Sequence, residues 1–379
     1  MFVNLSSCKI IFPCYSITGF LRQLYLRCFP LMKKIILSSP ANHVRISMRT
    51  ADLDRFFQTP GHLGPTAPDD NVPYRRKECS HPKGIVFSWQ NPEMTPCTLQ
   101  ISVSPSMGKC RNHPAIRRKT VYNLVPGIPY YWRVVSADGR RSEVRMFTLQ
   151  TDAPRFLFVD GVTNVRDLGG WHGIDGRKIR YGMVFRGAQF QTWPTTKHPV
   201  TKRGIATLLD DLSLHTDLDL RGDDVKPFKG FNGKVRHKTF AIYAYATWKN
   251  YDIGEKPFGI FSPNERKRIK KIFELFATPS TYPLYMHCQG GCDRTGTVAF
   301  LLGAALGMSL EDLLLEYELS NLSLAQGRSR HTEVMLKFLE KWESYVPGGT
   351  IGEQVGTYLA ECGIREETLA RIRELLLEP

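Results

Sequence analysis

Hydrophobic and polar positions follow different periods in different parts of the chain. Between residues 84 and 149, short runs of alternating apolar and polar residues are separated by turn signals such as Asn91-Pro92 and Pro126-Gly127. Alternation of this kind is typical of strands with one buried face, and several short strands with tight turns predict a small β-sandwich. The predicted strands cover residues 84–89, 98–104, 120–124, 130–137 and 145–149.

From residue 156 onward, apolar runs of strand length alternate with helical patterns. Strands alternating with helices, followed by a series of helices, predict an α/β domain with a mostly parallel sheet flanked by helices. The helix expected after Ser262 begins with a capping sequence, because Pro263 and Glu265 follow that serine. Strands are predicted at 156–159, 215–221, 235–242 and just before Cys288, and helices at 201–212, 262–277, 298–306, 309–320, 332–345, 352–361 and 366–377.

Neither pattern extends through the first 70 residues. Residues 1–51 contain seven Lys or Arg and no Asp or Glu, and residues 52–82 are rich in Pro, Gly and Asp, as is typical of a linker. No apolar stretch reaches the ~20 residues of a membrane-spanning helix. We therefore predict three parts: a disordered basic leader and linker at 1–70, an all-β sandwich at 71–152 and an α/β catalytic domain at 153–379.

The leader leaves the location of the protein open. Its apolar and basic residues do not form a complete export signal, so the alternatives are a cytoplasmic protein and one that is exported through a degenerate signal. An amphipathic segment lying on a membrane surface is a further interpretation of the same residues.

Composition narrows the range of functions. The 379 residues include 51 Lys or Arg and 36 Asp or Glu, which gives a net charge of +15, and about +8 remains without the seven leader cations. A moderately basic body suits an acidic substrate such as a phosphate ester, and no nucleic-acid-binding motif accompanies the charge. The nine cysteines include no C-x2-C pair, so we expect no zinc site and no other metal or cofactor.

One glycine-rich loop combines the groups that phosphate chemistry needs. Residues 282–296 read YPLYMHCQGGCDRTG, an apolar strand followed by a tight loop and the start of a helix. Such a loop directs backbone N–H groups and the positive end of a helix dipole toward one point, where an anion can bind. Cys288 would lie at the bottom of this site as a thiolate nucleophile, and Arg294 would bind two phosphate oxygens. The loop therefore predicts hydrolysis of phosphate esters through a phosphocysteine intermediate.

The loop and several motifs before it resemble one enzyme family. The pattern His-Cys-x2-Gly-x-Asp-Arg-Thr-Gly is similar to the signature loop of the protein tyrosine phosphatase superfamily. With the motifs that precede it, the segment from about residue 156 to residue 379 resembles the atypical bacterial tyrosine phosphatases, which include secreted enzymes that act on phosphotyrosine and on lipids. The other motifs are NVRDLGG at 164–170, DGR at 175–177, FRG at 185–187 and DLR at 219–221.

This resemblance implies roles for the loop residues. Cys288 would be the nucleophile, Arg294 the phosphate clamp and Asp293 the general acid. Most phosphatases of the superfamily place the acid on a separate loop, so Asp252 is the alternative to Asp293. The remaining loop residues are expected to bind the substrate phosphate or to orient the loop, and they are His287, Gln289, Gly290, Gly291, Cys292 and Thr295.

Two interpretations remain open for each of three positions. Arg166 and Asp167 would either contact the loop or hold the turn at Gly169-Gly170. Cys292 occupies a position where many members of the resembled family have lysine, whose positive charge favours phosphoinositide head groups. Cys292 would either cap an oxidised Cys288 as a resolving thiol or have no role beyond its small size.

The predicted sandwich also carries a resemblance. Residues 124–135, LVPGIPYYWRVV, resemble a corner of a fibronectin type III-like module. In such a module Trp132, and with it Trp89, would belong to the core. The module is expected to bind a protein or a glycan partner.

Taken together, these features predict a phosphatase that needs no metal or cofactor and acts on phosphotyrosine proteins. One alternative is a phosphoinositide or inositol-phosphate phosphatase, which would share the loop and its nucleophile. The other is an inactive protein of the same fold that only recognises phosphate. We expect neither nucleic-acid binding nor a transmembrane span.

Overall fold

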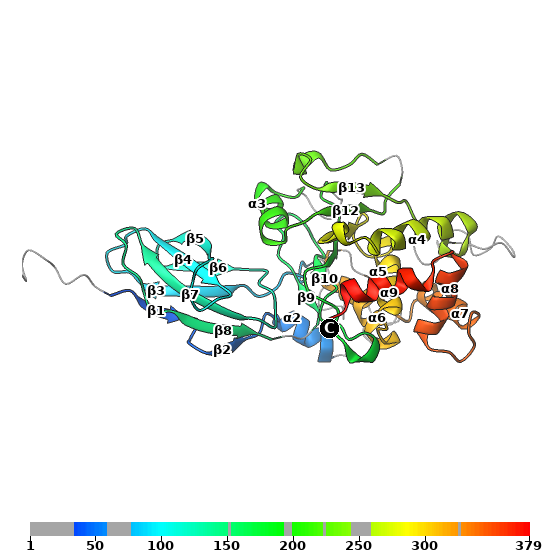
Figure 1. The fold of residues 1–379 in the computed structure, drawn as a ribbon, viewed down its shortest axis with the longest axis horizontal. Helices are drawn as coiled ribbons and strands as arrows, with labels where there is room; N and C mark the ends of the chain where they lie inside the picture. Colours follow the sequence, from blue (N-terminus) through cyan, green and yellow to red (C-terminus); the bar gives the residue numbers. More distant parts are fainter. Residues whose placement is uncertain are drawn as a thin grey trace, which may run out of the picture. The chain divides into compact units, whose positions relative to one another are not determined.

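The computed structural model describes residues 34–58, 77–150, 153–192, 199–222, 225–243, 259–324 and 327–379 (Figure 1). The chain forms two compact units. One contains Met1–Asn42, Phe87–Lys119 and Tyr130–Met146, and the other contains His43–Val86, Thr120–Pro129 and Phe147–Pro379. The predicted domain boundaries at residues 70 and 152 differ from these limits and stay a prediction. In the described ranges, no helix combines the length and the apolar character needed to cross a membrane.

Two sheets form the β-rich part of the chain. Phe87 of β3 and Trp132 of β7 meet edge to face, with ring centroids 5.1 Å apart. Every second side chain of these strands is buried, so Trp89 and Trp132 lie in the core, as predicted. One sheet has the order β1-β3-β6, with β1 at Ile36–Ser39, β3 at Ile85–Gln90 and β6 at Arg118–Val121; the other has the order β2-β8-β7-β4-β5, with β2 at Val44–Ile46, β4 at Cys97–Ser102, β5 at Arg111–Ala115, β7 at Pro129–Ser136 and β8 at Arg145–Leu149.

All five strands predicted in this part are present, with ends that differ by up to three residues. The structure adds β5, which pairs with β4 in antiparallel register. The sequence of β5 is RNHPA and its side chains are half-buried or exposed. A strand at the edge of a sheet without apolar alternation leaves no period for sequence analysis to detect.

Residues 36–58 form secondary structure, which differs from the predicted disordered leader and linker. They contribute β1, β2 and helix α2 (Ala51–Gln58). Thr50 caps the helix, since its hydroxyl accepts a hydrogen bond from Leu53 N at 3.2 Å. Leu53 and Phe56 are buried in the core of the part predicted to be catalytic, residues 153–379, which is called the catalytic part below. Strands of three or four residues and a two-turn helix are too short for periodicity to reveal.

A six-stranded mixed sheet with flanking helices forms the catalytic part, in agreement with the predicted α/β pattern. The strand order is β13-β12-β14-β11-β10-β9. The first four strands in this order are parallel, whereas β10 and β9 run antiparallel at one edge. Their bounds are β9 Arg155–Phe156, β10 Arg166–Asp167, β11 Val184–Gly187, β12 Thr216–Asp219, β13 Arg236–Thr239 and β14 Leu284–His287.

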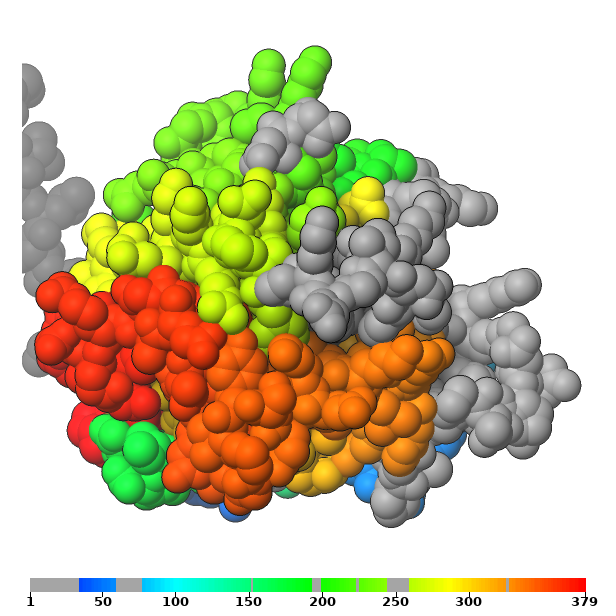
Figure 2. Space-filling model, turned by 90° about the vertical axis from the view of Figure 1, so that its right-hand side faces the viewer, coloured from blue at the N-terminus to red at the C-terminus, as the bar shows by residue number. Residues whose placement is uncertain are grey.

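Both faces of this sheet are covered. Leu284 and Met286 of β14 belong to a large core cluster with residues of α4–α9, and Tyr285 between them belongs to a second cluster with residues next to α3. Figure 1 shows α3 and α4–α9 on opposite sides of the sheet, and Figure 2 shows α4, α7, α8 and α9 reaching the surface. The bounds are α3 Lys202–Ala206, α4 Pro263–Phe276, α5 Arg294–Ala305, α6 Leu310–Glu318, α7 Glu333–Glu343, α8 Ile351–Glu361 and α9 Glu366–Leu376.

The capping sequence predicted for α4 is present. The Ser262 hydroxyl accepts a hydrogen bond from Glu265 N at 3.4 Å, and Pro263 occupies the first turn. The nitrogen of Pro263 carries no hydrogen. This costs no hydrogen bond, because an N–H at the first position of a helix has no partner within the helix. These local signals start α4 where the sequence placed it.

Candidate active site

The glycine-rich loop begins at the carboxyl end of β14, in the middle of the sheet. β14 lies between β11 and β12, and the register pairs His287 with Gly187 on one side and with Asp219 on the other. Ligands of open α/β sheets bind beyond the carboxyl ends of the strands. The loop, residues 288–293, occupies this edge, and helix α5 begins directly after it at Arg294.

The backbone carbonyl groups of the loop are held from outside. In a trans peptide the C=O group and the next N–H group point in opposite directions. Three outward carbonyl groups in succession therefore turn three N–H groups toward the inside of the loop, where they suit a phosphate. The hydrogen bonds are Gln189 N to Gln289 O at 3.0 Å, Asn164 Nδ2 to Gly290 O at 3.0 Å and Arg186 Nη2 to Gly291 O at 2.6 Å.

Gly291 is required by the path of the loop. Its φ is +71°, in the left-handed region, and a Cβ atom at this position would lie 2.1 Å from Gly187 O. Only glycine combines this conformation with so close an approach of two backbone segments. The absence of a side chain lets the loop pass directly over the end of β11.

Cys288 is buried at the start of the loop, with 4% of its surface exposed. The preceding His287 donates from Nδ1 to Cys288 O at 3.1 Å, and its Nε2 lies 2.9 Å from Asp217 Oδ1. Because both ring nitrogens face acceptors, the environment favours the imidazolium. Burial alone would lower the pKa of His287, but the carboxylate of Asp217 outweighs burial and the pKa is raised.

Asp217 links this histidine to a second one. His237 Nδ1 lies 2.9 Å from Asp217 Oδ2. Burial acts to raise the pKa of Asp217, but the two histidines outweigh burial and lower it to about 2. The carboxylate is therefore charged at neutral pH and favours the imidazolium form of the histidine that precedes the nucleophile. A nearby positive charge is one of the features that favour a cysteine thiolate.

A buried cluster of charged groups lies behind the residues that hold the loop. Glu316 of α6 accepts from Arg166 Nε at 2.6 Å and also pairs with Arg186. Arg166 Nη1 donates to Asn164 Oδ1 at 2.5 Å, so Arg166 reaches the loop through Asn164. Two guanidinium groups and one carboxylate give the cluster a net positive charge, which favours an anion in the loop.

Asp167 holds a turn beside this cluster. Its carboxylate accepts from Gly169 N at 2.8 Å and from Gly182 N at 2.7 Å, and it pairs with Arg155 at 2.5 Å. Burial raises the pKa of Asp167, although Arg155 opposes that effect. These contacts hold the turn at Gly169-Gly170, which was one of the two interpretations of this residue.

Asp293 lies just before α5, and 46% of its side chain is exposed. Arg328 donates from Nε to Asp293 Oδ1 at 3.0 Å and from Nη2 to Oδ2. These two charge-assisted hydrogen bonds hold the Asp293 carboxyl group against Arg328. To deliver a proton, Asp293 would have to loosen this ion pair.

Cys292 and Thr295 are buried in and after the loop. Cys292 Sγ donates to Gly290 O at 3.3 Å and accepts from Asn164 Nδ2 at 3.2 Å. Burial raises the pKa of Cys292 to about 11, so the thiol is neutral at pH 7 and adds no charge to the site. The hydroxyl of Thr295 has no hydrogen-bond partner within the described parts of the chain.

Sequence reasoning missed three side chains that contact the loop, those of Asn164, Arg186 and Arg328, and also Gln189, which donates to the loop from its backbone N–H. The first two stand in the motifs NVRDLGG and FRG, which were the only signal for them. Arg328 lies between helices in a segment without apolar periodicity, so no pattern marks it. Asp252, the alternative acid, lies outside the described residues, and the side chain of Gln289 is exposed.

The catalytic part of the chain is similar to known proteins. The model of the tyrosine phosphatase family matches residues 157–378. A Cupriavidus necator protein with the provisional name of a tyrosine-protein phosphatase is 28% identical over 186 residues, which cover 45% of this chain and 64% of that protein, less than two thirds of its length. Two structures of the catalytic core of Siw14, one described as a PP-IP phosphatase from S. cerevisiae in complex with citrate, match 43% of this chain. They are 15% and 16% identical, are covered over 83% and 82% of their length, and both have a TM-score of 0.29.

Proposed function

The chain belongs to the tyrosine phosphatase family, and on this basis we propose that it hydrolyses phosphate monoesters, phosphotyrosine above all, through a phosphocysteine intermediate. The observation that carries the proposal is the outward anchoring of three successive loop carbonyl groups between Cys288 and Arg294. It supports a ring of N–H donors with a thiol at one end and a guanidinium at the other. These are the groups that a transferring phosphoryl group needs.

The proposed reaction has two steps. The Cys288 thiolate attacks phosphorus in line, a P–S bond forms, and the bond to the leaving oxygen breaks as that oxygen takes up a proton. Loop N–H groups and Arg294 hold the three equatorial oxygens, whose charge spreads in the transition state. In the second step the residue that gave up the proton takes one from water, the water oxygen attacks phosphorus and the P–S bond breaks, so the products are inorganic phosphate and the regenerated thiolate. All steps use residues of this chain, so activity is expected to persist in excess chelator.

The general acid is proposed to be Asp293, with Asp252 as the alternative. Asp293 lies next to Arg294 and needs no loop closure, but its side chain is engaged in an ion pair with Arg328. Removing the true acid should slow poor leaving groups such as phosphotyrosine by about 100-fold or more and activated nitrophenyl esters less. The comparison of Asp293→Asn with Asp252→Asn on both substrates decides the assignment. If only Asp252→Asn discriminates between the leaving groups, Asp293 is not the acid.

Phosphotyrosine is favoured over phosphoinositides by the character of position 292. Cys292 is buried and neutral there, so the loop lacks the additional cation that a multiply phosphorylated head group would attract. Phosphate release from phosphotyrosine and phosphoserine peptides, phosphoinositides and inositol phosphates tests this choice. The highest kcat/KM is expected for phosphotyrosine. Binding of vanadate without turnover of any of these esters would instead indicate a phosphate-recognising protein.

We also propose that the β-rich part is a fibronectin type III-like module with a protein or glycan partner. The strand orders β1-β3-β6 and β2-β8-β7-β4-β5 support a two-sheet arrangement, here of eight strands. The buried contact between Phe87 and Trp132 supports a shared core between the two sheets. Retention of polysaccharides or of proteins on the immobilised chain would identify the ligand class. Equal retention by an unrelated protein without tryptophan would contradict the proposal of a specific partner.

A further inference from the structure

A short segment far before the catalytic motifs lies against the residues that hold the loop. This segment, residues 77–82, precedes the part of the chain that the family model matches. Its Cys79 N donates to Leu322 O at 2.6 Å, a residue that follows α6. The segment and the loop belong to the same compact unit.

Two polar side chains of the segment form hydrogen bonds to the catalytic part. Glu78 accepts hydrogen bonds from the hydroxyl groups of Ser80 and Thr163 and from Ser80 N at 3.0 Å. Ser80 is fully buried and Thr163 is 2% exposed. A charged acceptor binds hydroxyl donors more strongly than a neutral one does, so Glu78 fixes both hydroxyl groups in orientation.

The Ser80 hydroxyl in turn holds Asn164. The hydroxyl donates a hydrogen bond to Glu78, and its oxygen accepts one from Asn164 N at 3.2 Å. Asn164 is fully buried, and its φ of +63° lies in the left-handed region that side chains rarely adopt. Such a conformation persists where surrounding contacts fix it, and the hydrogen bond to Ser80 is one of those contacts.

Asn164 carries the effect to the loop. Its Nδ2 donates to Gly290 O at 3.0 Å and lies 3.2 Å from Cys292 Sγ. The hydrogen bond to Gly290 O is one of the three that turn the loop N–H groups inward. A displaced Asn164 would leave Gly290 O with only the weaker thiol donor of Cys292, 3.3 Å away. The carbonyl group could then rotate, and the N–H of Gly291 would turn away from the phosphate with it.

We propose that Glu78 and Ser80 are positioning residues of the active site, which act on the phosphate loop through Asn164. The inference rests on the proposed phosphatase function and extends the catalytic machinery to a segment before the β-rich part. It also means that residues 157–378 alone lack part of the support of their own loop.

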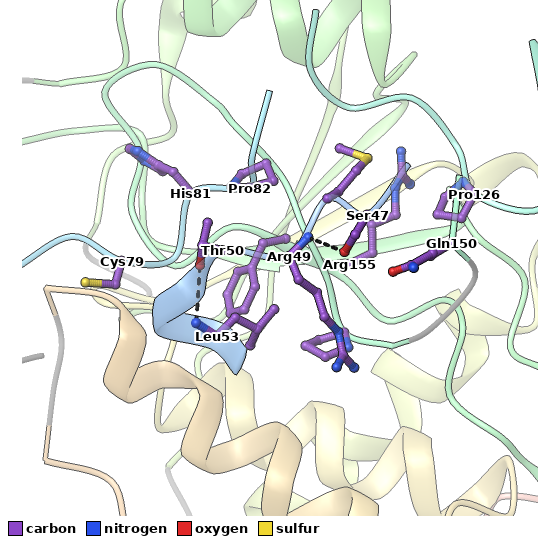
Figure 3. A pocket seen from close by; sticks show the side chains of 13 residues that line it. Ser47, Arg49, Thr50, Leu53, Cys79, His81, Pro82, Pro126, Gln150 and Arg155 are labelled. Atoms are coloured by element: carbon purple, nitrogen blue, oxygen red, sulfur yellow. Dashed lines mark hydrogen bonds between the residues drawn. The ribbon is translucent and has the colours of Figure 1, made fainter. Parts of the chain in front are cut away.

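Packing and hydrogen bonds together hold this segment. Cys79 packs against the large core cluster, and the ring of His81 meets that of Phe158 edge to face, with centroids 5.0 Å apart. Cys79, His81 and Pro82 also line a cavity together with Thr50 and Leu53 (Figure 3), and none of the loop residues lines it. The link from the segment to the loop therefore runs through Ser80 and Asn164 and not through this cavity.

The test uses the full chain with Ser80→Ala, Ser80→Thr and Glu78→Gln, and with Lys83→Ala as the matched control, because the Lys83 side chain is exposed near the end of the same segment. Three quantities are measured: the inhibition constant of vanadate, the melting temperature, and kcat/KM for an aryl phosphate. The last is divided by the fraction of Cys288 that reacts with an alkylating reagent. Ser80→Ala is expected to lower kcat/KM about tenfold and to raise the inhibition constant of vanadate by a similar factor, since both depend on the placement of loop N–H groups. Ser80→Thr, which keeps the hydroxyl, should restore most of both, and Lys83→Ala should change neither.

Each outcome decides the matter. Loss of melting temperature alone, with kcat/KM per active thiol and vanadate inhibition unchanged, would overturn the proposal, as would an equal loss in Lys83→Ala. If Ser80→Ala does not fold, Glu78→Gln takes its place with an expected loss of about threefold, because the amide keeps one acceptor. If the parent chain hydrolyses no ester, the proposed function fails, and calorimetric binding of tungstate then tests the segment. Weaker tungstate binding in Ser80→Ala supports the proposal; equal binding, or none by the parent, overturns it.

Discussion

The β-rich part and the catalytic part differ in what their interiors contain. Among the described residues from 84 to 150, the buried polar side chains are uncharged: Asn91, Ser102, Asn123, Ser136 and Ser142. From residue 155 onward the buried side chains include Arg155, Arg166, Asp167, Arg186, Asp217, Asp219, Arg221, Glu265, His287, Glu316 and Glu318. Burial of charge requires desolvation that ion pairing barely offsets, so such groups are rarely retained for stability alone.

The position of the buried charges explains the difference. Arg186, Asp219 and His287 lie at the carboxyl ends of adjacent strands, where the loop begins. Concentrations of buried charge are typical of functional sites, because they orient polar groups and set their protonation. A change in the β-rich core should therefore affect stability alone, whereas a change in the buried charges should affect stability and turnover together.

The largest effect is expected at the nucleophile itself. Cys288→Ser should reduce turnover of an aryl phosphate by at least about 10³-fold, because a serine hydroxyl is not ionised at neutral pH. Vanadate binding, measured by calorimetry, should persist because the loop N–H groups remain. Cys110→Ser in the β-rich part is the matched control and should keep full activity. A Cys288→Ser protein within tenfold of the parent would contradict the proposed mechanism.

The general outline of this site was predictable from sequence, because its groups are local. Cys288 and Arg294 stand six residues apart in one loop, and the strand before and the helix after it follow from periodicity. The residues that turn the loop carbonyl groups outward are not local. Asn164 and Arg186 precede the loop by more than 100 residues, and only the sheet brings them beside it. Their motifs marked them, but no pattern in a single sequence states what they contact.

The same limit explains what was missed at the start of the chain. Helix α2 has only eight residues, and its two buried side chains, Leu53 and Phe56, give too short a pattern to distinguish from a linker. The role of Ser80 depends on Asn164, 84 residues later. Local propensity carries no information on such contacts, whereas β7, with eight alternating residues, was found to within one residue.

The next effect concerns the buried cluster. Glu316→Gln removes the carboxylate shared by Arg166 and Arg186 and should lower the free energy of unfolding by about 3–5 kcal/mol. The kcat/KM per folded molecule should also fall, since Arg186 holds Gly291 O. Urea titration and steady-state kinetics on one preparation measure both quantities.

Leu99→Ala is the matched variant in the β-rich core, where the leucine is fully buried. It should lower the free energy of unfolding by about 2–5 kcal/mol and leave kcat/KM unchanged. Loss of turnover in both variants, or in neither, would mean that the two interiors do not differ in the way inferred from their contents.

A smaller effect is expected in the dependence of stability on pH. The pKa of folded His287 is raised by Asp217, above the unfolded value of about 6.5. The contribution of His287 to the free energy of unfolding is therefore complete below pH ~6.5. It is lost as pH rises through the folded pKa, with a slope of up to about 1.4 kcal/mol per pH unit. Asp219 Oδ1, 4.0 Å from His287 Nδ1, adds to this effect, and Arg221 opposes it.

Urea unfolding of the parent and Asp217→Asn at several pH values from 6 to 9 measures the joint contribution of Asp217 and the two histidines beside it, His287 and His237, because the other titrating groups are common to both proteins. The stability difference between the two proteins should be largest near pH 6 and shrink as pH rises. Asp217 itself, with a pKa lowered to about 2, adds stability that is lost as pH falls from about 4 toward 2. A constant difference between pH 6 and 9 would show that His287 does not hold its proton in the way its contacts indicate.

The smallest effect is expected for the ion pair at the rim of the site. Arg328 and Asp293 are 22% and 46% exposed, so water screens their attraction, and Arg328→Gln should change the free energy of unfolding by less than about 1 kcal/mol. Added salt should reduce this difference further, whereas the deficit of Glu316→Gln should persist in salt because its ions are buried. Arg328→Gln also releases the Asp293 side chain from its ion pair. If Asp293 is the acid, it can then turn toward the leaving group, and esters with poor leaving groups should be hydrolysed faster relative to nitrophenyl esters. A large, salt-insensitive loss of stability in Arg328→Gln would place this pair with the buried charges and remove the distinction between the interior of the site and its rim.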